Sequence, residues 1–249
     1  MANYRINIAA MTEVGPTRKD DQDAILVNGL VGVKSGARVT MTGDLSVPIT
    51  VAVVDGMGGY AGGADAAALV ATLLANEIVT DDEDEMDVFL TQVSERVRLA
   101  GEAWHTPSMG ATFVAATFDE DGVSLVNAGD CRLYQLRDGY LGLMSQDDRS
   151  NPDSSAVSQA LGPSRRISSH AYRIDFEGER ERFLLCCDGV WGAIPNEELT
   201  ALCRSEKAPN EVVKEISKRI YELQATDNCS ALVVDVSRQG EGAKREGNS

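Results

Sequence analysis

The chain has very few histidines: only His105 and His170 occur among its 249 residues. Zinc sites of the usual kind draw on imidazoles and thiolates, and a Ser-His-Asp triad needs a histidine as its base. The shortage therefore argues against zinc hydrolases and against hydrolases that use such a triad. We expect both histidines to occupy structural or surface positions.

Cysteines are also scarce, and none of the five belongs to a Cys-x-x-Cys pair. An odd number without such spacing does not make a disulfide framework. Cys131, Cys186, Cys187 and Cys229 lie in apolar, strand-like runs. We therefore expect them to be small buried hydrophobic residues.

Long hydrophobic runs and positive charge are missing as well. The longest apolar stretch, residues 66–75, is too short to span a bilayer, and no signal peptide opens the chain. A net charge of −16 argues against binding to nucleic acid or to anionic membranes. We expect a cytoplasmic monomer. The acidic run 81–87 is expected to be a solvated loop rather than a metal site.

Strand and helix patterns alternate unevenly along the chain. The Ala-rich segment 62–78 predicts a helix, apolar residues at spacings of three and four predict another from Met86 to Trp104, and Pro209 opens a third. Short strands are predicted at residues 4–11, 24–28, 49–54, 111–118, 123–127, 131–137, 140–144, 167–176, 182–187 and 229–236. Consecutive strands with paired helices favour an α+β fold of antiparallel sheets covered by helices.

The sequence shows no internal repeat and no linker that divides it. We expect residues 1–237 to form a single domain. The polar, Gly-rich residues 238–249 are expected to be a disordered tail.

Four aspartates stand out because each follows an apolar run and precedes a small or turn residue. They are Asp55, Asp130, Asp188 and Asp227. An unpaired carboxylate at the edge of a core is costly, so four of them indicate a shared partner. The simplest partner for converging carboxylates is a hard divalent cation.

The motifs around these aspartates carry a family resemblance. Asp55-Gly-Met-Gly-Gly59, Gly129-Asp-Cys-Arg-Leu-Tyr134, Cys187-Asp-Gly-Val-Trp191 and Asp227-Asn228 resemble, in order, the signature motifs of bacterial metal-dependent Ser/Thr protein phosphatases of type 2C. Residues 15–24, 110–112 and 159–162 also match, so the resemblance spans residues 4–236. It implies two stacked antiparallel β-sheets flanked by helix pairs, with a two-metal site at one end.

The resemblance also implies roles for individual residues. Asp55 would bridge two Mn²⁺ or Mg²⁺ ions. The Gly56 carbonyl would help to bind one of them, and Asp188 and Asp227 would hold the other. Arg18 matches the phosphate-binding arginine, whose guanidinium can clamp two phosphate oxygens.

Supporting roles fall to residues near these ligands. Asp23 would steer water around the metals, Gln22 stands where many relatives have glutamate, and Asn228 would fix the loop of Asp227. Arg132 and Trp191 are expected to be structural.

Three departures from the family pattern are visible. Met57 replaces a histidine of eukaryotic relatives, and Gly192 replaces an aspartate that helps to hold a third metal. Asp130 together with Asp188 would then bind a third ion only weakly, unless Asp147 or Asp148 replaces the missing ligand. The segment between residues 147 and 159 is short, and residues 150–155 are expected to form a mobile loop that leaves the site open.

The predicted function is metal-dependent hydrolysis of phosphoserine and phosphothreonine on proteins that a Ser/Thr kinase modifies. One alternative is a catalytically weak module that binds phosphoproteins.

Two other motifs suggest different chemistry. The Cys-x5-Arg spacing of Cys131 and Arg137 suggests a cysteine-dependent phosphatase, but the residues between them have a strand pattern. Residues 56–61 resemble a dinucleotide-binding turn, although Asp55 would repel a pyrophosphate and no series of strand–helix–strand units follows.

Overall fold

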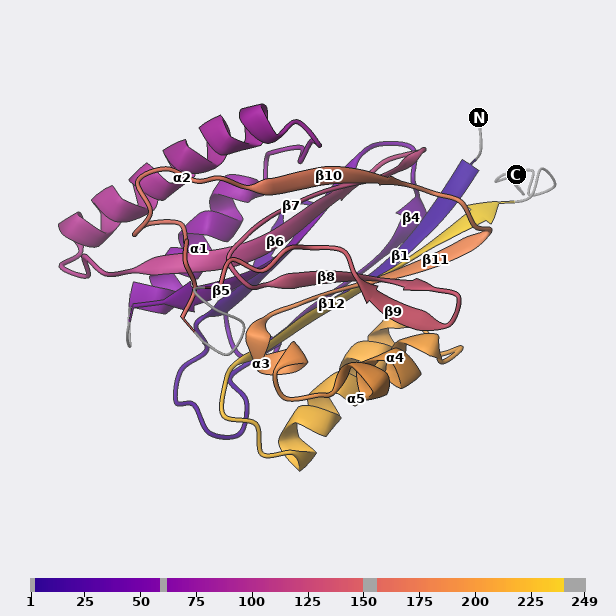
Figure 1. Ribbon diagram of the computed structural model, residues 1–249. Coiled ribbons are helices and arrows are strands. Elements are labelled where there is room, and N and C mark those ends of the chain that lie inside the picture. Colours follow the sequence, from indigo (N-terminus) through magenta and orange to yellow (C-terminus); the bar gives the residue numbers. More distant parts are fainter. Residues whose placement is uncertain (1–2, 59–61, 150–155, 240–249) are drawn as a thin grey trace, which may run out of the picture.

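Two six-stranded antiparallel sheets, stacked face to face, form the centre of the computed structural model (Figure 1), which describes residues 3–58, 62–149 and 156–239. The first sheet has the order β4 (Ala37–Asp44), β1 (Asn3–Glu13), β12 (Cys229–Gln239), β11 (Arg180–Cys186), β8 (Arg132–Arg137) and β9 (Tyr140–Leu143). The second has the order β10 (His170–Asp175), β7 (Gly122–Ala128), β6 (Gly110–Phe118), β5 (Ile49–Met57), β2 (Asp23–Val27) and β3 (Leu30–Gly32).

A helix pair covers the outer face of each sheet (Figure 1). Helices α1 (Gly62–Leu74) and α2 (Glu83–Ala103) pack on the second sheet, and α4 (Asn196–Arg204) and α5 (Pro209–Glu222) pack on the first. The short helix α3 (Asp188–Trp191) follows β11 directly. The predicted fold of two antiparallel sheets flanked by helix pairs is confirmed.

Strand β5 shows why the sequence produces these layers. Val51 and Val53 point into the core between the two sheets, whereas Ala52 and Val54 point into the core beneath α1 and α2. Both faces of the strand are buried, so its sequence is a continuous apolar run instead of an alternating one. The run ends at Asp55, where the strand reaches the end of the sandwich.

Four elements have weak sequence signals and were not predicted: β3, β4, α3 and α4. Strand β4 is an edge strand whose residues alternate between half-buried and exposed, and only Val39 and Met41 pack against the core. Helix α4 buries only Leu199, Thr200 and Cys203. So few buried positions give little periodicity to detect.

The acidic run 81–87 is not the predicted loop. Asp82 is the N-cap of α2, and its side chain accepts a hydrogen bond from the Glu85 backbone N–H at 3.0 Å. Residues 83–87 form the first turns of the helix. Negative charge is favourable at a helix N-terminus, because the unpaired N–H groups there are partially positive. The prediction missed this capping role.

Two predicted boundaries also shift. The first helix ends at Leu74 instead of residue 78, and β12 continues to Gln239, past the predicted domain end at residue 237. Residues 240–249 of the predicted tail and residues 150–155 of the predicted loop lie outside the described residues.

The expectation for the cysteines is confirmed, because all five are free and buried. None of the helices in the described part of the chain combines the length and apolar character that crossing a membrane requires.

Candidate active site

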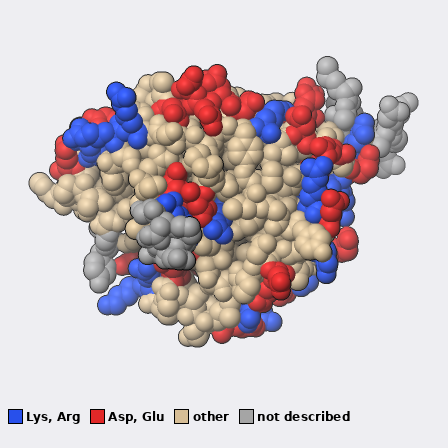
Figure 2. Space-filling model, viewed as in Figure 1, with Lys and Arg blue, Asp and Glu red and all other residues tan. Residues whose placement is uncertain are grey.

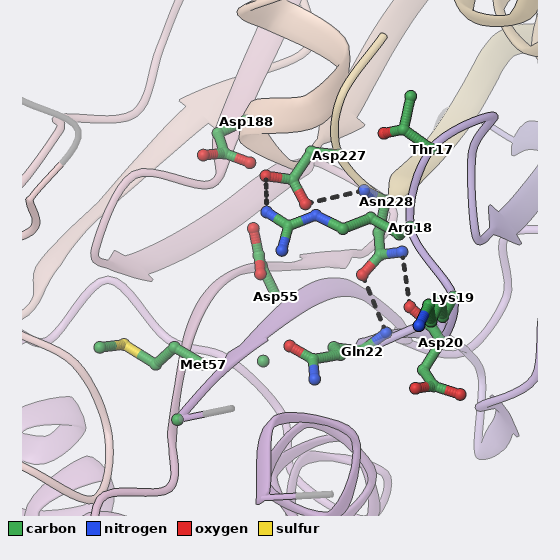
Figure 3. Close-up of a pocket in the computed structure, with 12 residues that line it drawn as sticks. Thr17, Arg18, Lys19, Asp20, Gln22, Asp55, Met57, Asp188, Asp227 and Asn228 are labelled. Atoms are coloured by element: carbon green, nitrogen blue, oxygen red, sulfur yellow. Dashed lines mark hydrogen bonds and ion pairs between the residues drawn. The ribbon is translucent and has the colours of Figure 1, made fainter. Parts of the chain in front are cut away.

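A cleft of about 630 Å³ opens where β5 ends and β12 begins, and we call it the aspartate cleft (Figure 3). It is lined by Thr17, Arg18, Lys19, Asp20, Gln22, Asp55, Gly56, Met57, Gly58, Asp188, Asp227 and Asn228. The fold thus brings together residues from four separate segments. Seven of the site residues predicted from sequence lie on this lining: Arg18, Gln22, Asp55, Gly56, Asp188, Asp227 and Asn228.

Three carboxylates face one another in the cleft (Figure 3). Asp55 belongs to β5 in the second sheet, Asp188 begins α3 after a strand of the first sheet, and Asp227 precedes β12. Burial raises the pKa of Asp55 well above its usual range, and the charges of the surrounding aspartates raise it further. Burial and the neighbouring Asp227 likewise raise the pKa of Asp188. Without a bound cation, the negatively charged forms of these three carboxylates therefore destabilise one another.

The residues present fit hard divalent cations. Carboxylate and carbonyl oxygens are the ligands that Mg²⁺ and Mn²⁺ prefer, and the lining offers three such carboxylates. Gly56 packs so tightly that a Cβ would lie 2.0 Å from the Gly63 carbonyl oxygen and 2.4 Å from that of Gln22. Only glycine allows the backbone to take this position beside the aspartates.

Asp23 lies behind the cleft and is buried. The antiparallel register of β2 and β5 places it directly opposite Asp55. Its carboxylate is 2.7 Å from Ser230 Oγ, which is in turn 2.8 Å from Thr12 Oγ1. Burial and the charge of Asp21 raise the pKa of Asp23 to about 8. Asp23 therefore lies close to Asp55, and its role around the metals stays a prediction.

Cys187 also lies within reach of a metal, although the sequence marked it only as a hydrophobic residue. The ligand atoms of Asp23, Asp55 and Cys187 all lie within 4.8 Å of one another. Burial raises the thiol pKa well above its usual value, and the sulfur already accepts a hydrogen bond from the Ser230 backbone N–H at 3.2 Å. Because a metal binds thiolate and not thiol, we do not assign Cys187 as a ligand, and it lies outside the lining of the cleft.

Arg18 places its guanidinium among the three carboxylates (Figure 3). Its Nη2 is 2.7 Å from Asp227 Oδ2, and its Nε donates to the Thr226 carbonyl oxygen at 3.1 Å. The hydrogen bond with Asp227 raises the arginine pKa further above its usual value. Arg18 therefore stands beside the candidate metal ligands, in a position to contact a bound phosphate.

Asn228 joins the loop of Asp227 to the β1–β2 loop. Its Nδ2 donates to the carbonyl oxygens of Val14 and Asp20 at 3.0 and 2.9 Å, and its Oδ1 accepts from the Gln22 backbone N–H at 3.0 Å. Gly15, with a positive φ of 73°, lets the loops approach closely, since a Cβ there would lie 2.3 Å from the Asp227 carbonyl oxygen.

Asp130 lies outside the lining of the cleft and is buried. Burial and the nearby charge of Asp188 raise its pKa to about 6. Arg149 Nε is 3.9 Å from its Oδ2, and Trp191 donates its indole N–H to the Asp130 carbonyl oxygen at 3.0 Å. The Arg149 and Arg132 guanidinium carbons lie 4.9 and 3.6 Å from the centroid of the Trp191 ring.

The two carboxylates proposed as substitutes for the missing third-metal ligand have other partners. Asp147 forms an ion pair with Arg132 at 2.7 Å. Asp148 accepts from the Gly129 backbone N–H at 2.8 Å and lies 2.9 Å from His170 Nε2. The basic side chain beside Asp130 is that of Arg149. Arg149 was not identified from the sequence, because it belongs to no recognisable motif.

The competing interpretations do not fit the structure. Cys131 is buried, and residues 132–137 form β8 rather than a phosphate-binding loop. Strand β5 belongs to an antiparallel sheet, unlike the parallel sheet of dinucleotide-binding folds. Gly59 and the next two residues of that motif lie outside the described residues.

Comparison with known proteins agrees with the site. The family model described as protein phosphatase 2C matches residues 37–227. The chain therefore belongs to the protein phosphatase 2C family, as its motifs indicated. It is an enzyme of the metal-dependent serine/threonine protein phosphatase class.

Among curated proteins, the chain is similar to the serine/threonine phosphatase stp of Listeria monocytogenes, at 25% identity over 79% of this chain and 88% of the relative. Among solved structures, it is similar to PppA, described as a key regulatory component of T6SS in Pseudomonas aeruginosa. The TM-score is 0.75 at 27% identity, over 94% of this chain and 98% of PppA.

The catalytic domain of PstP, solved in complex with two manganese ions, shares the fold. Its TM-score is 0.72 at 23% identity, over 94% of this chain and 99% of that domain.

The first prediction concerns stability. Mn²⁺ at 100 times its dissociation constant should stabilise the folded protein by about 2.7 kcal/mol. For a chain of this size that corresponds to a rise of about 5 °C or more in Tm. Asp55→Asn should lose most of this rise and should melt no lower than the wild type in EDTA, because the substitution removes a buried charge. Calorimetry or dye-based melting measures both.

The matched control is Asp138→Asn, an exposed aspartate in the β8–β9 turn whose positive φ suits asparagine equally well. It should keep the full Mn²⁺-dependent rise. An Asp55→Asn protein that still gains the wild-type increment would show that the metal binds elsewhere.

Proposed function

We propose that this protein hydrolyses phosphoserine and phosphothreonine esters of proteins in the aspartate cleft, with Asp55, Asp188 and Asp227 holding two Mn²⁺ or Mg²⁺ ions. The observation that carries the proposal is the convergence of these carboxylates around the Arg18 guanidinium (Figure 3). When bound, two such cations supply an activated water at neutral pH and neutralise phosphoryl charge.

Different residues of the chain would bind the cations and the phosphate. Asp55, with the Gly56 carbonyl oxygen, and the carboxylates of Asp188 and Asp227 would hold the two cations. Arg18 uses its Nε and Nη2 on Thr226 and Asp227, which leaves other N–H groups of its five for phosphoryl oxygens. A planar guanidinium can bind two such oxygens at once.

No histidine among the described residues takes part in protonating the leaving group. Neither His105 nor His170 lines the cleft, and the thioether of Met57 has no proton to give. His170 instead contacts Asp148. We propose that water in the cleft protonates the serine or threonine oxygen.

The substrate is proposed to be a protein that a Ser/Thr kinase has phosphorylated. A charge of −16 repels nucleic acid and anionic lipid, so neither is proposed as a partner. We propose that the enzyme acts as a cytoplasmic monomer.

The direct test measures phosphate release from a small chromogenic phosphomonoester and from a phosphothreonine peptide, with Mn²⁺ and with EDTA. The proposal expects turnover with Mn²⁺ and none in EDTA. Peptide binding without any turnover would instead identify a module that only binds phosphoproteins.

Asp55→Asn should lower kcat by several orders of magnitude, because the substitution removes the charge that the two cations share. Asp188→Ala and Asp227→Ala should recover part of their loss at high Mn²⁺, since each removes a ligand from one ion. Steady-state kinetics on folded protein decides the matter: an Asp55→Asn enzyme with more than about a tenth of wild-type turnover contradicts the assignment.

Arg18→Ala should raise KM for a phosphopeptide more than it lowers kcat. The guanidinium would contact the phosphate in the ground state and in the transition state alike, and uniform binding appears in KM. Inhibition by inorganic phosphate should weaken in parallel. Unchanged KM and unchanged phosphate inhibition would remove Arg18 from the phosphate site.

Two metal ions should bind tightly, with a third only at millimolar concentration. Gly192 supplies no carboxylate, and the Arg149 cation already lies 3.9 Å from Asp130. Arg149→Gln should strengthen the weak site by about threefold or more, because it removes a competing positive charge. Titration calorimetry measures the stoichiometry, and three sites of equal affinity in the wild type would contradict this prediction.

A further inference from the structure

A second cleft, of about 580 Å³, adjoins the aspartate cleft, and we call it the lysine cleft. It is lined by Val14, Lys19, Asp20, Asp21, Val33, Lys34, Ser35 and Ala64. Lys19 and Asp20 line both clefts. The two clefts therefore meet along the β1–β2 loop, one residue from Arg18.

The lysine cleft carries exposed positive charge on a strongly acidic protein. Lys19 and Lys34 are both exposed, and neither forms a salt bridge within residues 3–58, 62–149 and 156–239, unlike Lys207 and Lys218. Figure 2 shows basic side chains at the lower left, where Figure 1 places the β1–β2 loop.

The acidic residues of the lysine cleft offset this charge only in part. The Asp21 carboxylate is turned inward, where it accepts from Thr12 Oγ1 at 2.9 Å and from the Asp23 backbone N–H at 3.2 Å. Asp20 remains exposed, so two ammonium groups face one exposed carboxylate.

Both lysines stand on backbone that is held in place. The loop of Lys19 is held by hydrogen bonds on both sides of this residue. Thr17 Oγ1 donates to the Ala225 carbonyl oxygen at 3.3 Å, and the Asn228 side chain donates to the Asp20 carbonyl oxygen. The turn that carries Lys34 is fixed to β1 by hydrogen bonds from the Val14 backbone N–H to Ser35 Oγ and from the Gly36 N–H to the Thr12 carbonyl oxygen, each 2.9 Å long. Their backbone positions beside the cleft are thus set before a substrate arrives.

We propose that Lys19 and Lys34 form a subsite that selects substrates with acidic residues close to the phosphorylated serine or threonine. The inference rests on the proposed function of the aspartate cleft. An extended peptide advances about 3.4 Å per residue, so a peptide whose phosphate lies at Arg18 reaches the lysine cleft within a few residues. The charge of −16 repels an acidic peptide at long range, and the two lysines offset this repulsion where the peptide binds.

The test uses three phosphothreonine peptides of equal length with aspartate, asparagine or lysine at the three positions on each side of the phosphothreonine. Mn²⁺-dependent kcat/KM is measured at low and at high salt. Wild-type enzyme should prefer the aspartate peptide over the asparagine peptide by about fivefold at low salt, through KM, since two exposed ion pairs contribute modestly. High salt should reduce the preference.

Lys19→Gln and Lys34→Gln should each lower this ratio, and the double variant should bring it to about one or below. Lys214→Gln, an exposed lysine on α5, should leave the ratio unchanged. A ratio of one in the wild type, or an undiminished ratio in the double variant, would overturn the proposal. Turnover of the asparagine peptide by the wild-type enzyme distinguishes the two proposals. If the wild type does not turn over this peptide, the result counts against the proposed function and not against the lysine subsite.

Discussion

Repulsion among closely spaced, largely half-buried carboxylates is the constraint on which the rest of this site depends. Asp55 lies on a strand of the second sheet and Asp188 follows a strand of the first, and the fold brings both to the cleft that Asp227 lines. Asp23 lies opposite Asp55 on the neighbouring strand. Such a cluster is unfavourable in the protein alone. It persists because two extensive apolar cores on either side hold the strands in register. The packing thus offsets the cost of an arrangement that we propose binds cations.

A single amide organises the rim of that cluster. Asn228 makes three hydrogen bonds to the β1–β2 loop, and its own backbone N–H donates to Asp227 at 2.9 Å. Arg18 and Lys19 sit on the loop that Asn228 holds. The proposed metal ligation, the proposed phosphate contact and the proposed choice of flanking residues therefore all depend on the position of one side chain.

The sequence was most informative where burial is greatest. Strands such as β5 and β6 are apolar throughout because both of their faces are covered, and the aspartate at the end of β5 was therefore conspicuous. Strand β4 and helix α4 bury few side chains and left too little pattern to predict. Lys19 and Arg149 were missed for another reason: their importance comes from neighbours far away in the chain, and no local spacing records that proximity. The roles of the aspartates came from motif resemblance, since periodicity alone indicates only that they converge.

The pairing of β1 with β12 joins the two ends of the domain. Residues 3–13 lie antiparallel to residues 229–239 in the middle of the first sheet. Asp227 and Asn228 stand immediately before the last of these strands, so they reach the other ligands only after it has docked. During synthesis on the ribosome, a growing chain therefore carries Asp55 and Asp188 long before it has a complete metal site. Because the proposed site includes Asp227, catalytic competence requires that β12 has first paired with β1, which makes it a late step in folding.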